Sequence, residues 1–397
     1  MNPLPPALAF ARANGLTTLL FLVLIGCATA LGVAVTAQER ALREASARAA
    51  DPFGVIVAGP GSHTDLLMSV VYLQPNPTHL LPPEISSEIL AERRATFVAP
   101  VAFGDSHAGV PIVGTVSRLL THLADDRPIE GRMFERAEEA VIGSRVLLEI
   151  GAEVVAQHGV GLADEGDHGL IRIVGRLPET GTAWDRAILV PIEFSWLAHS
   201  LTTGHGPGVD TIGPPWDPAY LPGIPAFIVG YDSLPAAYAL RQAWRTGETT
   251  AFFPAEVLVT LYAILGDVRA LMGVLTLATQ ALVVAAVLSG SVALMQLYRT
   301  RLAVLRALGA TRLYVLAVMW SYVMTLVAGG ALVGLLVGWG VAQVVSSVIA
   351  EEAGLVLSPR IGGAELALVG ALLGLGALVA FLPAWTLFRR PPVTYLR

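Results

Sequence analysis

Five histidines in the middle of the chain are the first candidates for chemistry. They stand in glycine- or aspartate-rich segments, and they are His63, His107, His168, His199 and His205. Imidazole and carboxylate groups together bind zinc-like ions, and Asp105 and Asp167 each lie within two residues of one of these histidines. No pair has the tight spacing of a helical metal site. We therefore interpret them as solvated loop histidines, with a metal site as the alternative.

A second chemical pattern is the run Phe-Gly-Asp-Ser-His at 103–107, which contains the three residue types of a hydrolase triad. A triad brings its members together from separate places so that base and nucleophile align. Three consecutive residues cannot all point into one site, and the chain has no G-x-S-x-G motif. These observations argue against an enzyme.

The most distinctive functional pattern is the basic segment 299–312, which we call the coupling segment. Its arginines, its leucines at a spacing of three and its glycine predict a short amphipathic helix that ends at a glycine cap. These residues are Arg299, Arg301, Leu302, Leu305, Arg306, Leu308, Gly309 and Arg312. The alternative interpretation is an ordinary basic loop that only sets membrane topology.

Four long apolar segments position these patterns. Each is long enough for the roughly 20 apolar residues that a membrane-spanning helix needs. They cover 15–37, 271–298, 313–349 and 366–388. The sequence therefore predicts four transmembrane helices, with one large domain between the first and the second.

Charge predicts the orientation. All 25 basic residues are arginines, and the coupling segment, with four, and the tail 389–397, with three, contain no acid. The positive-inside rule places both termini and the coupling segment in the cytoplasm of a bacterial inner membrane. Residues 39–269 hold 28 acids and 16 arginines, a net charge of −12, which argues against nucleic acid as a partner. The single cysteine, Cys27, excludes an intrachain disulfide.

The remaining segments fit this layout. The sequence predicts an amphipathic cytoplasmic segment at 1–14, helical stalks at 38–50 and 248–270, and a short periplasmic loop at 350–365. The periplasmic domain covers 51–247. Its expected strands are 53–58, 67–72, 95–103, 171–174 and 187–191, and its expected helices are 83–94 and 137–156. The fold class is therefore four transmembrane helices with stalks and one α+β periplasmic domain.

Residues 303–310 read A-V-L-R-A-L-G-A. This run resembles the signature of FtsX-like (MacB-type) ABC transporter permeases, which reads approximately R-R-E-I-A-x-L-R-A-L-G-A. The ending P-x-x-x-L-R at 392–397 and the G-R-x-F motif at 131–134 are also similar to that family. Arg301 departs from the pattern, because the family usually has an acid there.

The resemblance implies a homodimer in which a cytoplasmic ABC ATP-binding subunit seats on each copy. ATP and Mg would bind that partner, and this chain itself would bind no cofactor. Motion would pass through the stalks to the periplasmic domain, which would engage a cargo or a periplasmic partner. The residues agree, since the chain lacks the lysine of a P-loop and its predicted spans, in contact with membrane lipid, hold no charged residue or histidine.

Glycines at a spacing of four predict close helix packing in the last two spans: Gly330, Gly334, Gly338, Gly370 and Gly374. A general excess of glycine in membrane helices is the other interpretation. Two other functions remain open. One is a membrane-anchored regulator that activates a periplasmic partner without transport, with a link to metal homeostasis. The other is a stand-alone sensor without an ATPase.

Overall fold

The computed structural model describes residues 2–74, 76–158, 169–263, 309–353 and 357–389, with isolated positions between 273 and 289. The chain forms two compact units. The helical unit contains Met1–Arg43, Ile264–Val348 and Leu357–Arg397. The sheet unit contains Glu44–Ala263 and Ile349–Val356.

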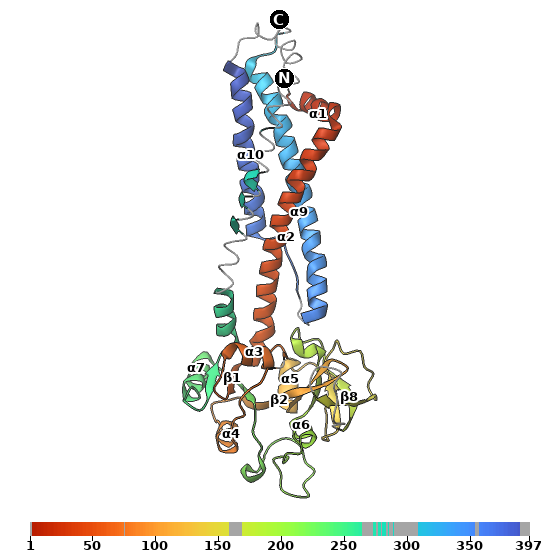
Figure 1. Ribbon diagram of the computed structural model, residues 1–397, viewed down its shortest axis with the longest axis vertical. Helices are drawn as coiled ribbons and strands as arrows, with labels where there is room; N and C mark the ends of the chain where they lie inside the picture. Colours follow the sequence, from red (N-terminus) through yellow and green to blue (C-terminus); the bar gives the residue numbers. More distant parts are fainter. Residues whose placement is uncertain are drawn as a thin grey trace. The chain divides into compact units, whose positions relative to one another are not determined.

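The helical unit is built from α1 (Leu4–Ala13) and from parts of three long helices, α2 (Gly15–Ala50), α9 (Arg312–Ala353) and α10 (Gly363–Arg389) (Figure 1). Among the described residues, Gly15–Phe53 and Leu313–Ala350 are long and apolar enough to cross a membrane, and α10 carries the shorter apolar stretch Gly363–Leu378. Most of the expected second span, 271–298, lies outside the described residues. The count of four spans therefore stays a prediction.

The sheet unit contains one mixed sheet. Its described strands follow the order β11-β1-β10-β2-β3-β9-β5-β8-β4, with β7 beside β2 and β6 beside β8. The strands are β1 (Val55–Ala58), β2 (Phe97–His107), β3 (Val110–Thr115), β4 (Glu130–Gly131), β5 (Glu139–Ile142), β6 (Glu153–Val155), β7 (Gln157–His158), β8 (Leu170–Arg176), β9 (Ile188–Pro191), β10 (Ala226–Gly230) and β11 (Thr250–Phe252). β3 with β9 and β5 with β8 are parallel pairs.

Helices cover both faces of this sheet, which explains why β1 and β10 are buried at every position. Successive side chains of a strand point to opposite faces. Ile56 and Ile228 accordingly pack in one core with α3 (His63–Val70) and α5 (Ser117–Leu123). Val57 and Phe227 pack in a second core with α4 (Pro83–Leu90), α6 (Ile192–Ala198) and α7 (Leu234–Ala243). Short 3-10 helices at Asp51–Phe53, Ala183–Arg186 and Pro218–Tyr220 complete the unit.

The expected strand at 67–72 is wrong, because α3 covers most of it. Ser62 caps this helix by accepting a hydrogen bond from the Asp65 amide at 3.3 Å. Leu66, Leu67 and Val70 then fall on the face that enters the core. β-Branched residues after Met68 suggested a strand, but the cap and the helical spacing decide the local structure.

The expected helix at 137–156 is also wrong. Its residues form β5, a turn and β6. Gly143 ends β5 where no side chain fits, since a Cβ atom there would lie 2.4 Å from the Asp185 carbonyl carbon. Gly151 has a φ of +97°, which stops any helix before β6. The alanines and glutamates that favoured a helix are overridden by the pairing of β5 with β8 and β9.

The first expected stalk segment is helical, but the second, 248–270, is helical only in part, because Thr250–Phe252 form β11. Residues 38–50 form the end of α2, and the segment Pro254–Ala263 is a helix, while 264–270 lie outside the described residues. Within the sheet unit, Ala50, Val257 and Leu258 share one core. The Tyr72 hydroxyl donates a hydrogen bond to the Ser46 carbonyl at 3.2 Å, so the C-terminal end of α2 is bonded to the rest of this unit.

Candidate functional site

The coupling segment is described only at its end. Gly309 has a φ of +98°, the left-handed conformation of a helix cap, and Arg312 is the first residue of α9. The Thr311 hydroxyl accepts a hydrogen bond from the Tyr314 amide at 3.2 Å, a start signal that sequence reasoning missed. The other six predicted residues lie outside the described residues: Arg299, Arg301, Leu302, Leu305, Arg306 and Leu308. Their role as an ATPase seat stays a prediction.

The N-terminal helix α1 packs against the start of α9. Ala7 is buried in a core with Val315 and Met319, and Ala310 packs on the edge of this core. The Tyr314 hydroxyl donates a hydrogen bond to the Asn2 carbonyl at 3.4 Å. The predicted cytoplasmic segment 1–14 therefore lies beside the residues that directly follow the coupling segment.

Three of the predicted packing glycines lie where α9 meets α2. A Cβ atom at Gly330 would lie 2.7 Å from Ile25, one at Gly334 would lie 2.5 Å from Thr29, and one at Gly338 would lie 2.5 Å from the Ala30 carbonyl oxygen. These approaches are too close for any larger residue. Glycine at these positions allows the two helix backbones to pack directly.

The predicted glycines of α10 do not share this role among the described residues. A Cβ atom at Gly370 or Gly374 would find nothing within 4 Å. Gly376 makes the close approach instead, where a Cβ atom would lie 2.9 Å from Val327 of α9. The four-residue spacing identified a glycine face on α10, but the packed position lies two residues further on.

The G-R-x-F motif has a structural role beside β5. Both terminal nitrogens of Arg132 donate to the Glu139 carboxylate, Nη1 at 2.7 Å, and the Glu135 amide adds a bond at 2.9 Å. These hydrogen bonds, the one from Arg132 first, lower the pKa of Glu139 to about 2. Gly131 has a φ of +78°, and a Cβ atom there would lie 2.5 Å from the Val174 carbonyl oxygen.

The four described candidate histidines occupy separate environments, and His168 lies outside the described residues. His63 shares a hydrogen bond of 2.6 Å with the Thr250 hydroxyl, and its ring stacks on Phe252. His107 donates from Nδ1 to the Val155 carbonyl at 2.8 Å. His199 Nε2 lies 3.6 Å from Asp105 Oδ1, and His205 Nε2 lies 3.9 Å from a Glu193 oxygen.

These distances bear on the metal alternative. Among the described residues, no group of three or more histidines, cysteines or acids is arranged to hold a metal ion. His63 is engaged with the core instead, where burial, helped by the charge of Arg245, lowers its pKa. The structure therefore brings two histidines to single carboxylates, Asp105 and Glu193.

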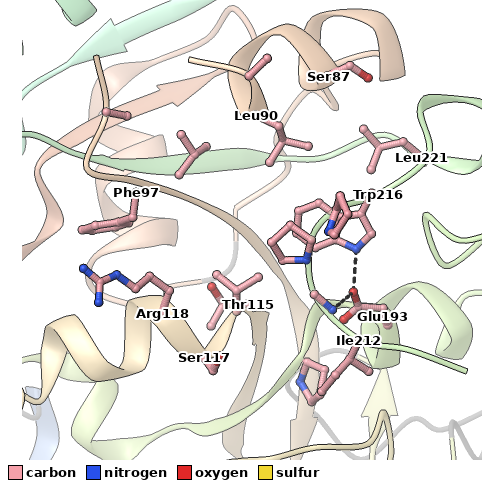
Figure 2. Close-up of a pocket in the computed structure, with 18 of the residues that line it drawn as sticks. Ser87, Leu90, Phe97, Thr115, Ser117, Arg118, Glu193, Ile212, Trp216 and Leu221 are labelled. Atoms are coloured by element: carbon pink, nitrogen blue, oxygen red, sulfur yellow. Dashed lines mark hydrogen bonds between the residues drawn. The ribbon is translucent and has the colours of Figure 1, made fainter. Parts of the chain in front are cut away.

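The sheet unit contains a cavity of about 670 Å³. It lies between α4, the start of β2, α5 and the loop 212–221, and Figure 2 shows Phe97 with Arg118 on one side and Glu193 with Trp216 on the other. Much of its wall is apolar or aromatic. Clefts of this size bind drug-sized molecules.

Glu193 is the unusual residue of the cavity. It lies on α6 with only 2% of its surface exposed. Its Oε1 accepts hydrogen bonds from the Trp216 indole and the Gly213 amide, both at 2.7 Å (Figure 2). No described residue donates to Oε2. Burial raises the pKa of this carboxyl.

Sequence reasoning missed Glu193, although a signal was present. The run Val-Pro-Ile-Glu-Phe-Ser-Trp at 190–196 places one acid among apolar residues. An acid in such a run is either exposed on a helix face or buried for a purpose. His205 was a candidate, but its neighbour was not.

Comparison with known proteins supports the membrane assignment. Residues 272–392 match the family described as FtsX-like permease C-terminal. No curated protein matches the sequence. Among solved structures, the chain is similar to the periplasmic region of MacB from Actinobacillus actinomycetemcomitans, with 8% identity and a TM-score of 0.32 over 52% of this chain and 92% of that one.

FtsX-like permeases are membrane-embedded, non-catalytic components of ABC transporters. The matched residues contain the coupling segment, α9 and α10. They therefore include the run at 303–310 that carries the resemblance. The resemblance is confirmed over residues 272–392, where this chain matches the FtsX-like permease C-terminal family.

Proposed function

We propose that this chain is the permease subunit of an ABC transporter that couples ATP hydrolysis by a separate cytoplasmic subunit to motion of its own sheet unit, for export, extraction or mechanical activation. The family match over 272–392 is the observation that carries this proposal. The chain lacks a P-loop lysine, so the energy must come from a partner.

The ATPase seat in this proposal is the coupling segment together with α1. The run at 303–310 combines a basic charge with an apolar stripe, and such a surface suits docking into a groove of a partner. α1 adds to the seat, because it packs on the start of α9 beside Ala310. A push on the coupling segment would reach α9 through the capped turn at Gly309 and Thr311.

In this proposal, motion driven by ATP hydrolysis reaches the sheet unit through α2. This helix runs without interruption over 36 residues, from an apolar stretch into a stretch rich in charge and alanine. A continuous helix carries displacement along its axis better than a flexible linker does. The close glycine contacts between α9 and α2 would let the two helices move together. In this proposal two copies of the chain pair, both termini face the cytoplasm and the sheet unit faces the periplasm.

The test is purification of the intact chain from its native membranes in mild detergent, with identification of every protein that accompanies it. We expect an ATP-binding subunit with the unchanged chain. We expect its loss with Leu305→Glu or Arg306→Glu, since either change removes part of the docking surface. Leu80→Glu and Arg360→Glu are matched controls, because both residues are exposed outside the coupling segment and should leave the subunit bound.

Two outcomes contradict this proposal. If no ATP-binding subunit accompanies the chain at any salt concentration, a stand-alone sensor or regulator is favoured. If the subunit remains bound to both coupling-segment variants, the seat lies elsewhere.

A further inference from the structure

The cavity of the sheet unit suits a ligand with an apolar body. Phe97, Phe134 and Trp216 supply aromatic surface, and Leu90 and Leu221 supply aliphatic surface. A cavity of about 670 Å³ accepts a molecule of drug size. Aromatic walls also favour cations, which are attracted to the faces of the rings.

The buried Glu193 carboxylate indicates which head group the ligand should carry. Two donors hold Glu193 Oε1, and Oε2 accepts no hydrogen bond from a described residue. A buried carboxylate with an unused oxygen is stabilised by a donor, and most strongly by a charged one. His205 Nε2 lies 3.9 Å from Oε1, and this distance is too long for a hydrogen bond.

Two other polar side chains of the wall, Glu92 and Thr115, are already engaged. The Glu92 carboxylate accepts hydrogen bonds from Arg94 and from the Trp244 indole. The Thr115 hydroxyl donates to the Pro100 carbonyl at 2.9 Å. Of the two lining carboxylates, Glu193 is therefore the one with an oxygen that no described residue donates to. The net charge of −12 over residues 39–269 also favours the approach of cations.

We propose that this cavity binds an amphipathic organic cation, with its apolar body against Phe97 and Trp216 and its protonated amine directed at the Glu193 carboxylate. Arg118 is exposed among the lining residues and marks the competing case, because an anionic ligand would choose it instead. Ligand binding by the sheet unit does not depend on the ATPase.

The experiment measures binding of three matched probes to the intact chain in lipid nanodiscs by equilibrium dialysis, with empty nanodiscs subtracted. The probes are 4-phenylbutylamine, 4-phenylbutanol and 4-phenylbutyrate, which share one apolar body and differ in the head group. We expect the amine to bind at least tenfold more tightly than the other two, since a charge-assisted hydrogen bond is worth one factor of ten or more.

Four variants locate the site. Glu193→Gln should remove the preference for the amine, while the matched control Glu92→Gln should keep it because Glu92 is already satisfied. Arg118→Gln should leave amine binding unchanged or tighter. Leu90→Trp fills the cavity from α4 without touching Glu193, and it should abolish binding even if Glu193→Gln folds poorly.

Several results overturn the proposal. They are equal binding of all three probes, binding of none, an equal loss in Glu92→Gln and Glu193→Gln, or butyrate binding that requires Arg118. Because no ATPase is present in the assay, none of these results bears on the coupling segment.

Discussion

The Arg40 guanidinium on α2 lies 2.9 Å from Oε2 of Glu365 in the first turn of α10. The Glu365 side chain is fully buried, and it also accepts a hydrogen bond from the Gly362 amide at 2.8 Å. This ion pair therefore joins two long helices of the helical unit. A buried charge that loses its partner is left uncompensated, so the pair is a point where single changes should be costly.

Replacement of Arg40 by Met should lower the free energy of unfolding by about 3–5 kcal/mol, because it strands the Glu365 carboxylate. Denaturant unfolding of the intact chain in detergent measures this loss. The double replacement Arg40→Met with Glu365→Leu should recover most of it. Arg43→Met is the control, since Arg43 pairs with Glu39 at the surface and should cost about 0–1 kcal/mol. A double variant no more stable than Arg40→Met contradicts the expectation.

The glycine contact between α9 and α2 predicts that two glycine-to-alanine variants differ in stability. Gly334→Ala places a methyl group 2.5 Å from Thr29 and 2.6 Å from the Gly26 carbonyl oxygen, and it should destabilise the chain by about 1–3 kcal/mol through overpacking. Gly374→Ala meets nothing within 4 Å and should leave the thermal midpoint of the single chain nearly unchanged. Equal midpoints for the two variants would show that the helices separate easily there.

The Glu139 carboxylate predicts a pH dependence in acid. Its pKa is lowered from 4.5 to about 2, mainly by the hydrogen bond from Arg132. Its contribution to stability is therefore full above the pKa of the unfolded chain, about 4.5, and is lost as the pH falls from about 4.5 to about 2. Glu139→Gln should therefore be less stable at pH 7, with the difference shrinking toward pH 2. Urea unfolding across this range measures the difference. Glu135→Gln, an exposed neighbour, should follow the unchanged chain; a gap of constant size for Glu139→Gln contradicts the assignment.

His63 predicts a separate dependence near neutral pH. Desolvation lowers its pKa below 6.5, as does the charge of Arg245, whereas Glu256 acts in the opposite direction. Stability is then full above about pH 6.5 and declines as the pH falls through the lowered folded value. His63→Gln should flatten this decline in thermal unfolding curves, and the exposed His79→Gln should not. A decline of equal slope in both variants would assign the titration to another group.

Part of the layout could be predicted from sequence, because apolar length, residue type and glycine spacing are local signals. The strands expected around residues 56, 99, 173 and 189 are present and buried, residues 15–50 form one helix, and three glycines of α9 lie at close contacts. Errors arose where a short cap or a tertiary contact decided the outcome. Ser62 made 67–70 helical, and the strand partners of β5 overrode the helix propensity of 137–156.

The cavity could not be predicted from sequence for a related reason. Its wall collects Phe97 from β2, Arg118 from α5, Glu193 from α6 and Trp216 from a loop, which are distant along the chain. Their meeting depends on the strand order, in which β2 and β9 flank β3. The histidines were candidates because of their residue type alone. The fold shows that His205 has Glu193 as its neighbour.

The buried Glu193 carboxylate should lower the stability of the fold at neutral pH, and a bound cation should restore it. Because burial raises its pKa, its contribution to stability is present below about pH 4.5 and is lost as the pH rises through the folded value. Glu193→Gln should therefore raise the thermal midpoint at pH 7, and this gain should shrink at pH 4. The amide oxygen of Gln can still accept from Trp216 and Gly213. Addition of 4-phenylbutylamine should raise the midpoint of the unchanged chain in proportion to the logarithm of its concentration, and it should raise the midpoint of Glu193→Gln less. A variant less stable than the unchanged chain at pH 7 would mean that the carboxylate is compensated within the fold, and the cavity would then have no need of a cation.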